Sequence, residues 1–224
     1  MTKPLAVAID GPSGAGKSTI ARILARELQF LYVDTGALYR TVGYHALQCG
    51  ADPSDAAAVE PLLEGLRVEL RYIDGEQHVF LNDEDVSGRI RQPEVSMAAS
   101  AVSALPAVRA FLFQLQRDTA ASQNVIMDGR DIGTVVLPEA GLKIFLTASP
   151  EDRARRRFEE LREKGVDTTF GEVLADMVKR DADDAGRAAA PLRQAEDAVL
   201  VDTTGNTLEQ SVELLKSMVK ERLA

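Results

Sequence analysis

The stretch LAVAIDGPSGAGKST, residues 5–19, decides the fold of this 224-residue chain. It contains the phosphate-binding pattern Gly-x-x-x-x-Gly-Lys-Ser, which runs from Gly11 to Ser18. An apolar, β-branched run precedes the pattern, and apolar residues spaced for one face of a helix follow it. Strand, glycine-rich loop and helix in this order predict a core that binds a nucleoside triphosphate. The alternative is a tight strand-to-helix turn without a ligand.

Each part of this phosphate loop suits a triphosphate. Glycines let backbone N–H groups approach phosphate oxygens beside the positive end of the following helix. Lys17 supplies a cation for the β- and γ-phosphates, and Ser18 supplies a hydroxyl for Mg²⁺. The residues expected to bind the nucleotide here are Gly11, Pro12, Ser13, Gly14, Ala15, Gly16, Lys17, Ser18 and Thr19. GTPases, ATPases and small-molecule kinases share this loop, so it does not identify the acceptor.

The composition limits the class of protein. Hydrophobic residues make up 45% of the chain, and no apolar run approaches a membrane span, so we expect a soluble globular protein. A net charge of −9 opposes broad binding to nucleic acid or anionic membranes. The single Cys49 cannot form an internal disulfide, and the N-terminal apolar run lacks a signal-peptide pattern. We therefore expect a cytoplasmic protein with small-molecule partners. A monomer is expected as well, although the composition does not determine the oligomeric state.

The hydrophobic periodicity predicts strands that alternate with helices. Apolar strands are expected at residues 5–10, 30–33, 124–128, 142–147 and 198–202. Helices are expected at 37–49, at 54–66 with Ser54 as its cap, across 93–123 with a break at Leu105-Pro106, from 150 to about 164, at 170–184 and from 207 onward. This order predicts a parallel sheet with helices on both faces.

One segment departs from this alternation. Residues 68–81 alternate between apolar and polar around an Asp74-Gly75 turn signal, which predicts an antiparallel hairpin inserted into the α/β chain. His45 and His78 are isolated in the sequence, and we expect both to have structural roles.

Polar residues follow two of the predicted strands, where open α/β sheets bind their ligands. Asp128 ends the strand at 124–128 and is a candidate for the Walker-B role of holding the Mg²⁺ shell, with a turn-capping aspartate as the alternative. Arg40 lies one turn into the helix after the second strand and can point back over the site, or else lie solvated on the surface.

The helix that begins near Pro150 is rich in arginine. Arg153, Arg156 and Arg157 share one face of it, and like charges so placed disfavour the helix unless an anion neutralises them. We interpret this helix as a mobile lid that closes over the ATP phosphates. The alternative is a solvated face whose arginines pair with Glu159, Glu160 and Glu163.

Arginines outside the lid point to a second anionic substrate. Arg40, Arg109, Arg130 and Arg187 come from different elements and are too many for the donor alone. Phosphoryl transfer between two phosphate esters requires both anions to be neutralised and held in line. The acceptor is therefore predicted to be a nucleotide.

Four blocks together resemble the bacterial cytidylate kinase family: IDGPSGAGKS at 9–18, YVDTGALYR at 32–40, DGRDIGTVV at 128–136 and the Arg180-Asp181-x-x-Asp184-x-x-Arg187 pattern. The resemblance spans about residues 6–203. It implies an adenylate-kinase-like P-loop NTPase fold with a five-stranded parallel sheet, an NMP-binding insertion with a small antiparallel sheet, and a short helical lid. The chain would form a single domain, 1–224, with its core at 1–34 and 103–224, its insertion at 35–102 and its lid at about 150–165.

The resemblance also implies an activity, namely Mg²⁺-dependent transfer of the γ-phosphoryl group of ATP to CMP or dCMP. It assigns catalytic roles to Lys17, Arg130, Arg157 and Arg187, ATP contacts to Arg153 and Arg157, and Mg²⁺ to Ser18 and Asp128. It assigns the acceptor to Thr35, Arg40, Ser100, Arg109, Arg130, Asp131, Arg180, Asp184 and Arg187.

Chemistry supports the assignment of Asp131 to the cytosine ring. The N4 amino group of cytosine donates a hydrogen bond where uracil presents the acceptor O4, so an ionised Asp131 favours CMP over UMP. The alternatives are a P-loop kinase for UMP, AMP or a metabolite hydroxyl, and a non-enzymatic nucleotide-binding regulator.

Overall fold

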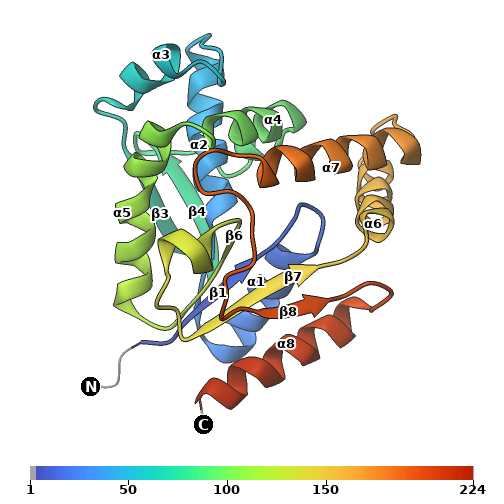
Figure 1. The fold of residues 1–224 in the computed structure, drawn as a ribbon. Coiled ribbons are helices and arrows are strands. Elements are labelled where there is room, and N and C mark those ends of the chain that lie inside the picture. Colours follow the sequence, from blue (N-terminus) through green and yellow to red (C-terminus); the bar gives the residue numbers. More distant parts are fainter. Residues whose placement is uncertain (1–3, 224) are drawn as a thin grey trace. The chain divides into compact units, whose positions relative to one another are not determined.

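The computed structural model of the protein describes residues 4–223, which form two compact units (Figure 1). The core unit comprises Met1–Tyr32 and Gln123–Ala224, and the inserted unit comprises Val33–Ser122. Residues 103–122 were expected in the core. The structure groups them with the inserted unit, because Val108 and Leu112 are fully buried in the hydrophobic cluster of that unit.

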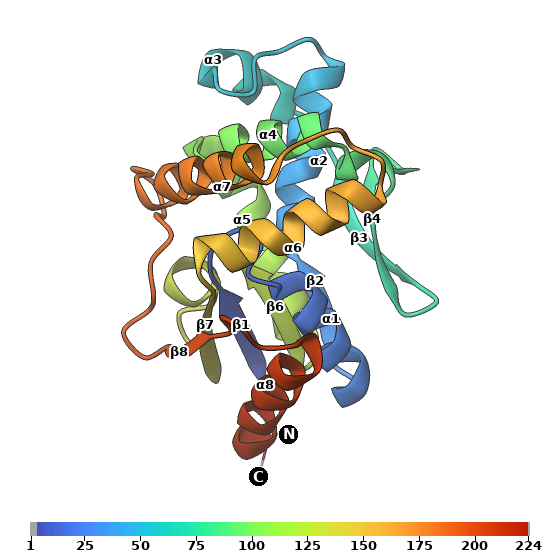
Figure 2. The same ribbon diagram turned by 90° about the vertical axis from the view of Figure 1, so that its right-hand side faces the viewer.

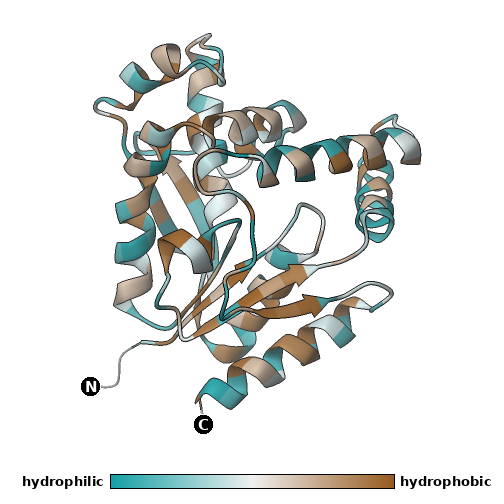
Figure 3. Ribbon diagram, in the orientation of Figure 1, coloured by the Kyte–Doolittle hydropathy of each residue, from teal (hydrophilic) through white to brown (hydrophobic). Residues whose placement is uncertain are grey.

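A five-stranded sheet in the order β2-β6-β1-β7-β8 confirms the predicted parallel sheet. Its strands are β1 (Ala6–Asp10), β2 (Leu31–Asp34), β6 (Val125–Gly129), β7 (Leu142–Thr147) and β8 (Val199–Asp202). Val7, Ala8 and Ile9 have no exposed surface, so both faces of β1 are covered, as expected for a parallel sheet. Figure 3 shows the hydrophobic colouring along β7 and β8.

The helices of the core unit follow the predicted order. They are α1 (Lys17–Leu28), α6 (Pro150–Glu163), α7 (Phe170–Ala185) and α8 (Leu208–Leu223), and a short π-helical turn, η3 (Ile132–Val136), follows β6. Ile20 and Leu24 of α1 share a hydrophobic cluster with Leu215 of α8 and Ile9 of β1. The helices α1 and α8 therefore pack on the sheet beside each other (Figure 2).

The inserted unit contains the predicted hairpin. Its elements are α2 (Thr35–Gln48), α3 (Ala56–Val59), η1 (Glu60–Leu63), β3 (Val68–Ile73), β4 (Glu76–Leu81), β5 (Glu84–Asp85), η2 (Arg89–Arg91), α4 (Pro93–Val102) and α5 (Pro106–Ser122). Asp74 and Gly75 both have positive φ, 53° and 80°, which joins β3 and β4 through the predicted tight turn. The third strand, β5, was not predicted.

The predicted helix at 54–66 is wrong in extent and in its cap. The segment forms only α3 and the 3-10 turn η1, and Asp55 caps it by accepting a hydrogen bond from the Ala57 N–H. Pro61 lacks the N–H that a continuous α-helix needs at this position, so the segment changes to a 3-10 turn there.

We find no single helix in residues 4–223 that is long and apolar enough to cross a membrane. Glu94–Val102 and Pro106–Ser122 pass that criterion of length and composition only as a pair, and the chain bends by 96° between them.

The helices α2 and α4 approach each other closely at Gly43. A Cβ on Gly43 would lie 2.9 Å from both the Ala98 carbonyl carbon and the Ala99 nitrogen, which are backbone atoms and cannot rotate away. We predict that Gly43→Ala lowers the free energy of unfolding by about 1–3 kcal/mol through overpacking. Gly171→Ala is the control, because a Cβ on Gly171 in α7 meets no atom within 4 Å.

The control should raise the free energy of unfolding by about 0.4–1 kcal/mol, because alanine restricts the unfolded chain more than glycine does. Chemical denaturation of both variants checks the pair. A Gly43→Ala protein as stable as the wild type would contradict the close packing of these helices.

Candidate nucleotide-binding site

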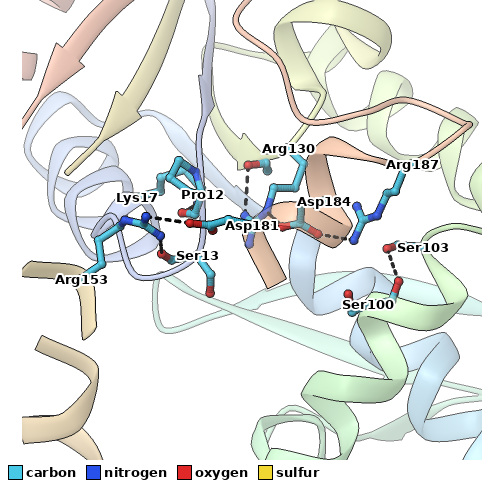
Figure 4. Close-up of polar contacts among 11 residues, drawn as sticks. Pro12, Ser13, Lys17, Ser100, Ser103, Arg130, Arg153, Asp181, Asp184 and Arg187 are labelled. Carbon is cyan, nitrogen blue, oxygen red and sulfur yellow. Dashed lines mark hydrogen bonds and ion pairs between the residues drawn. The ribbon is translucent and has the colours of Figure 1, made fainter. Parts of the chain in front are cut away.

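The phosphate loop connects β1 to α1. Gly11 has a φ of 149°, and a Cβ there would lie 1.9 Å from the Leu146 carbonyl oxygen, so only glycine fits. The Lys17 Nζ donates to the Pro12 carbonyl oxygen at 2.8 Å inside the loop (Figure 4). Among residues 4–223, no side chain caps the start of α1 by a hydrogen bond, and its first turn contains no acidic residue. The helix N-terminus is therefore suited to an anion.

Lys17 is only 6% exposed, which changes its acidity. Burial, followed by the positive charge of Arg130, lowers the pKa of Lys17 to about 7. The negative charges of Asp128 and Asp10 act in the opposite direction. A bound polyphosphate would add negative charge beside the amine and favour its ammonium form.

Ser18 and Asp128, the residues predicted to hold a metal, lie together. The Ser18 hydroxyl donates to Asp128 Oδ2 at 2.8 Å, and the Tyr32 hydroxyl donates to Asp128 Oδ1 at 2.9 Å. Hydroxyl and carboxylate oxygens are suitable ligands for Mg²⁺, which usually completes its shell with water and substrate phosphates. Within residues 4–223, no group of three or more His, Cys, Asp or Glu side chains is arranged to hold a metal ion. The pair therefore fits a site that is completed by a nucleotide.

Asp10, which ends β1 directly before the loop, was not predicted from the sequence as a site residue. Its Oδ1 accepts from the Ile132 N–H at 2.8 Å, and its Oδ2 accepts from the Gly133 N–H at 2.7 Å. Asp10 thereby fixes the segment after β6, which carries Arg130 and Asp131. Its position at the end of an apolar strand was the signal that identified Asp128, and it could have identified Asp10 as well.

In the core unit, one buried carboxylate accepts hydrogen bonds from two arginines that were predicted to bind the acceptor nucleotide (Figure 4). Asp184 is 1% exposed, and its Oδ2 accepts from Arg130 Nε at 2.7 Å while its Oδ1 accepts from Arg187 Nη2. Burial alone raises the pKa of Asp184, but Arg130 and then Arg187 more than offset it and hold the pKa below its ordinary value. The charge of Arg180 acts in the same direction. Asp131, which is 3% exposed, follows Arg130 directly.

Other predicted acceptor residues lie in the inserted unit, near the start of α2. Arg40 Nη2 donates to Asp34 Oδ2 at 2.7 Å, and Asp34 Oδ1 caps the helix by accepting from the Ala37 N–H. A Cβ on Gly36 would lie 3.1 Å from both Arg40 Nη1 and Asp34 Oδ1, so glycine allows this pair to close over the backbone. Thr35 is 2% exposed.

Ser100 and Arg109 form a second group in the inserted unit. Arg109 Nη1 donates to the Ser103 carbonyl oxygen at 3.3 Å, and its guanidinium lies over the Tyr39 ring, 5.7 Å from the centroid. The Ser103 hydroxyl donates to the Ser100 carbonyl oxygen at 2.8 Å. These contacts link the end of α4 to the start of α5.

The three arginines predicted to share one face of α6 have different partners. Arg153 is buried and bonded to protein atoms, whereas Arg157 is half-buried and pairs with Glu160 at 2.9 Å, as in the salt-bridged alternative. Arg156 donates to the Thr203 carbonyl oxygen, and its Nη1 lies 3.9 Å from where a Cβ on Gly16 would be. Arg156 is thus the lid arginine beside the helix start, and the sequence analysis gave it no ligand.

His78 has a carboxylate neighbour that its isolation in the sequence did not suggest. Its Nδ1 lies 2.7 Å from Asp85 Oδ2, across the β4–β5 connection. His45 Nε2 lies 3.9 Å from the Cys49 sulfur, one turn away on α2. These contacts are local to the inserted unit and are consistent with structural roles.

The acidity of Asp10 gives a prediction about pH. Burial raises the pKa of Asp10 to about 6 in the folded protein, although hydrogen bonds from Gly133 and Ile132 act against the rise. The protonated form is therefore favoured by folding, and this contribution is lost as the pH rises through the folded pKa. Relative to Asp10→Asn, the wild type should lose about 3 kcal/mol of unfolding free energy between about pH 4 and pH 6.

Urea denaturation of both proteins across this range measures the difference. The absolute stability of Asp10→Asn does not matter to the test, because only the pH dependence is compared. A difference that stays constant with pH would show that the Asp10 pKa is not raised.

Comparison with known proteins places these features in a family. The model of the family described as cytidylate kinase matches residues 7–221. Cytidylate kinase from Caldicellulosiruptor bescii is 48% identical over 99% of this chain and 100% of its own length. The enzymes of that name from Carboxydothermus hydrogenoformans and Lactiplantibacillus plantarum are 51% and 44% identical, over 95% and 97% of this chain and 96% of their own lengths.

Proposed function

This chain belongs to the cytidylate kinase family, and we propose from that premise how its residues transfer the γ-phosphoryl group of ATP to CMP or dCMP. The products are ADP and CDP or dCDP. The observation that carries the proposal is a complete phosphate loop in the same unit as an arginine cluster built around Asp184. The phosphate loop suits the donor polyphosphate, and the arginine cluster suits a second phosphate ester.

The donor phosphates bind to the phosphate loop. The backbone N–H groups at the start of α1 meet the phosphate oxygens, and Lys17 leaves the Pro12 carbonyl to contact the β- and γ-phosphates. Ser18 and Asp128 would hold Mg²⁺, directly or through water. When bound there, the ion would supply neutralisation of the phosphate charge.

The acceptor phosphate binds to arginines that are already positioned. Arg130 and Arg187 are held on Asp184 in the core unit, and Arg180 and Asp184 contribute to binding the phosphate and the ribose. The inserted unit contributes Thr35 and Arg40 to the same ligand. Because the arginines are fixed before CMP binds, less conformational entropy is lost on binding.

Asp131 recognises the cytosine ring, together with Ser100 and Arg109. Its carboxylate accepts a hydrogen bond from the N4 amino group, whereas the O4 of UMP would face it as a second acceptor. An unmatched polar pair at a buried site costs about 1–3 kcal/mol or more, which exceeds what shape alone distinguishes between these rings.

The transfer itself needs no general base, because the attacking phosphate oxygen of CMP is already anionic. Lys17, Arg130 and Arg187 neutralise charge as the phosphoryl group moves between two anions. Arg157 would join them by leaving Glu160, and an exposed ion pair of that kind is worth only about 0–1 kcal/mol. Because the chain has a net charge of −9, these anionic ligands must be held by local basic clusters. We propose that the protein works as a cytoplasmic monomer.

An acceptor survey tests the reaction and the role of Asp131. Wild-type protein with ATP and Mg²⁺ should release ADP much faster with CMP or dCMP than with UMP, AMP or GMP. Asp131→Ala should lower the ratio of kcat/KM for CMP to that for UMP by about tenfold or more, while KM for ATP stays within about threefold. Asp131→Asn should move the preference further toward UMP, because its amide can donate to O4.

A coupled assay of ADP release measures all these rates. Equal rates with CMP and UMP in the wild type would contradict the acceptor assignment. An unchanged ratio in both Asp131 variants would instead contradict the role of this residue alone.

The metal role of Asp128 makes a separate prediction. Asp128→Asn should raise the Mg²⁺ concentration needed for half-maximal activity by about tenfold, because it weakens the oxygen shell of the ion. Asp202→Asn is a matched control, since Asp202 also ends a strand of this sheet but binds Thr204. Magnesium titrations at fixed ATP measure both. An Asp128→Asn enzyme with the wild-type requirement would exclude Asp128 from the metal site.

A further inference from the structure

We propose that Arg153 is a positioning residue that ties the phosphate loop to α7 and thereby couples ATP binding to CMP binding. The proposal rests on the proposed function, in which Arg180 and Asp184 of α7 bind the acceptor nucleotide. It replaces the sequence-based expectation that Arg153 contacts ATP.

All three guanidinium nitrogens of Arg153 are bonded to the protein, and Figure 4 shows the bonds to Ser13 and Asp181. Nε donates to the Ala148 carbonyl oxygen at 2.9 Å, Nη1 to the Ser13 carbonyl oxygen at 3.0 Å, and Nη2 to Asp181 Oδ2 at 2.7 Å. The residue is 3% exposed. Turning it toward a phosphate would break these bonds and take the counterion from Asp181, which is costly for a buried charge pair.

The phosphate loop lies directly against this arginine. A Cβ on Gly14 would lie 3.2 Å from the Arg153 Cβ and 2.8 Å from the Met177 Cε of α7. Gly14 follows Ser13, whose carbonyl oxygen Arg153 binds. A shift of the loop on triphosphate binding would therefore displace both Arg153 and α7.

On α7, the contact lies within one turn of the acceptor residues. Asp181 follows Arg180 and precedes Asp184 by three residues, and Asp184 binds Arg130 at the end of β6. The second carboxylate oxygen of Asp181, Oδ1, is buried and accepts no hydrogen bond within the described residues, while Oδ2 forms the ion pair with Arg153. Hydrogen bonds thus link Ser13 to Asp181 through Arg153, and one turn of α7 separates Asp181 from Asp184, which binds Arg130.

Two arginines of α6 therefore have different roles. Arg156, which lies near the start of α1, is the better placed to meet donor phosphates. Arg153 transmits the state of the loop to α7. Because coupling between two ligands is reciprocal, CMP should affect ATP binding by the same factor.

Calorimetric titrations test the coupling. The dissociation constant of CMP is measured with and without a saturating non-hydrolysable ATP analogue, in wild type, Arg153→Lys, Asp181→Asn and Arg155→Ala. Asp181→Asn preserves shape and lies outside the donor site, and Arg155 is an exposed control on the same helix. Thermal unfolding establishes whether each variant is folded. If Arg153→Lys does not fold, Asp181→Asn alone decides the test.

In the wild type, the analogue should tighten CMP binding by about fivefold or more. In Asp181→Asn and Arg153→Lys, the analogue should change the dissociation constant of CMP by no more than about twofold. The dissociation constant of the analogue alone should stay within about threefold of the wild-type value. Arg155→Ala should keep the wild-type factor. A purely structural role would lower stability without removing the coupling.

Two outcomes would overturn the inference alone, with CMP still phosphorylated. The first is wild-type coupling in Asp181→Asn. The second is loss of analogue binding in Arg153→Lys with nothing changed in Asp181→Asn, which would make Arg153 a direct ATP ligand. A wild-type protein that neither binds nor phosphorylates CMP would overturn the proposed function as well.

Discussion

The buried carboxylate of Asp184, held between Arg130 and Arg187, is the interaction on which the rest of the site depends. Cationic side chains gathered to bind phosphates repel one another until a ligand arrives, and a buried charge without a partner costs several kcal/mol. Asp184 neutralises its two arginines in the unliganded protein, as Asp181 does for Arg153. The folded chain can therefore hold anion-binding groups in place in advance.

The parallel sheet places these groups together. In parallel strands the carboxyl ends meet at one edge, and the register pairs Ile9 with Asp128 and Asp10 with Gly129. The phosphate loop and the segment that begins with Arg130 are thus neighbours, although more than a hundred residues separate them. The two hydrogen bonds of Asp10 hold that second segment beside the first. Phosphoryl transfer depends on such fixed positions more than on covalent chemistry.

Local patterns predicted most of the fold, because the phosphate loop, the apolar strands and the Asp74-Gly75 hairpin are each encoded by residues close in sequence. Distant partners were not predictable in this way. Helical spacing placed Arg153 and Arg157 on one face, but it could not show that the first would be buried against Ser13 and Asp181 while the second stayed half-buried and paired with Glu160. The end of an apolar strand could have marked Asp10 as a candidate, but its partners are backbone N–H groups far along the chain, which no spacing rule reveals.

The central claim is that the arginines held by Asp184 receive the phosphate of CMP while Asp131 receives its base. A crystal structure of the protein bound to CMP tests this most directly. We predict that the CMP phosphate lies within hydrogen-bonding distance of the Arg130 and Arg187 guanidinium groups, and that the cytosine amino group meets the Asp131 carboxylate. A CMP phosphate bound away from both arginines, with the cytosine amino group facing another residue, would contradict the account.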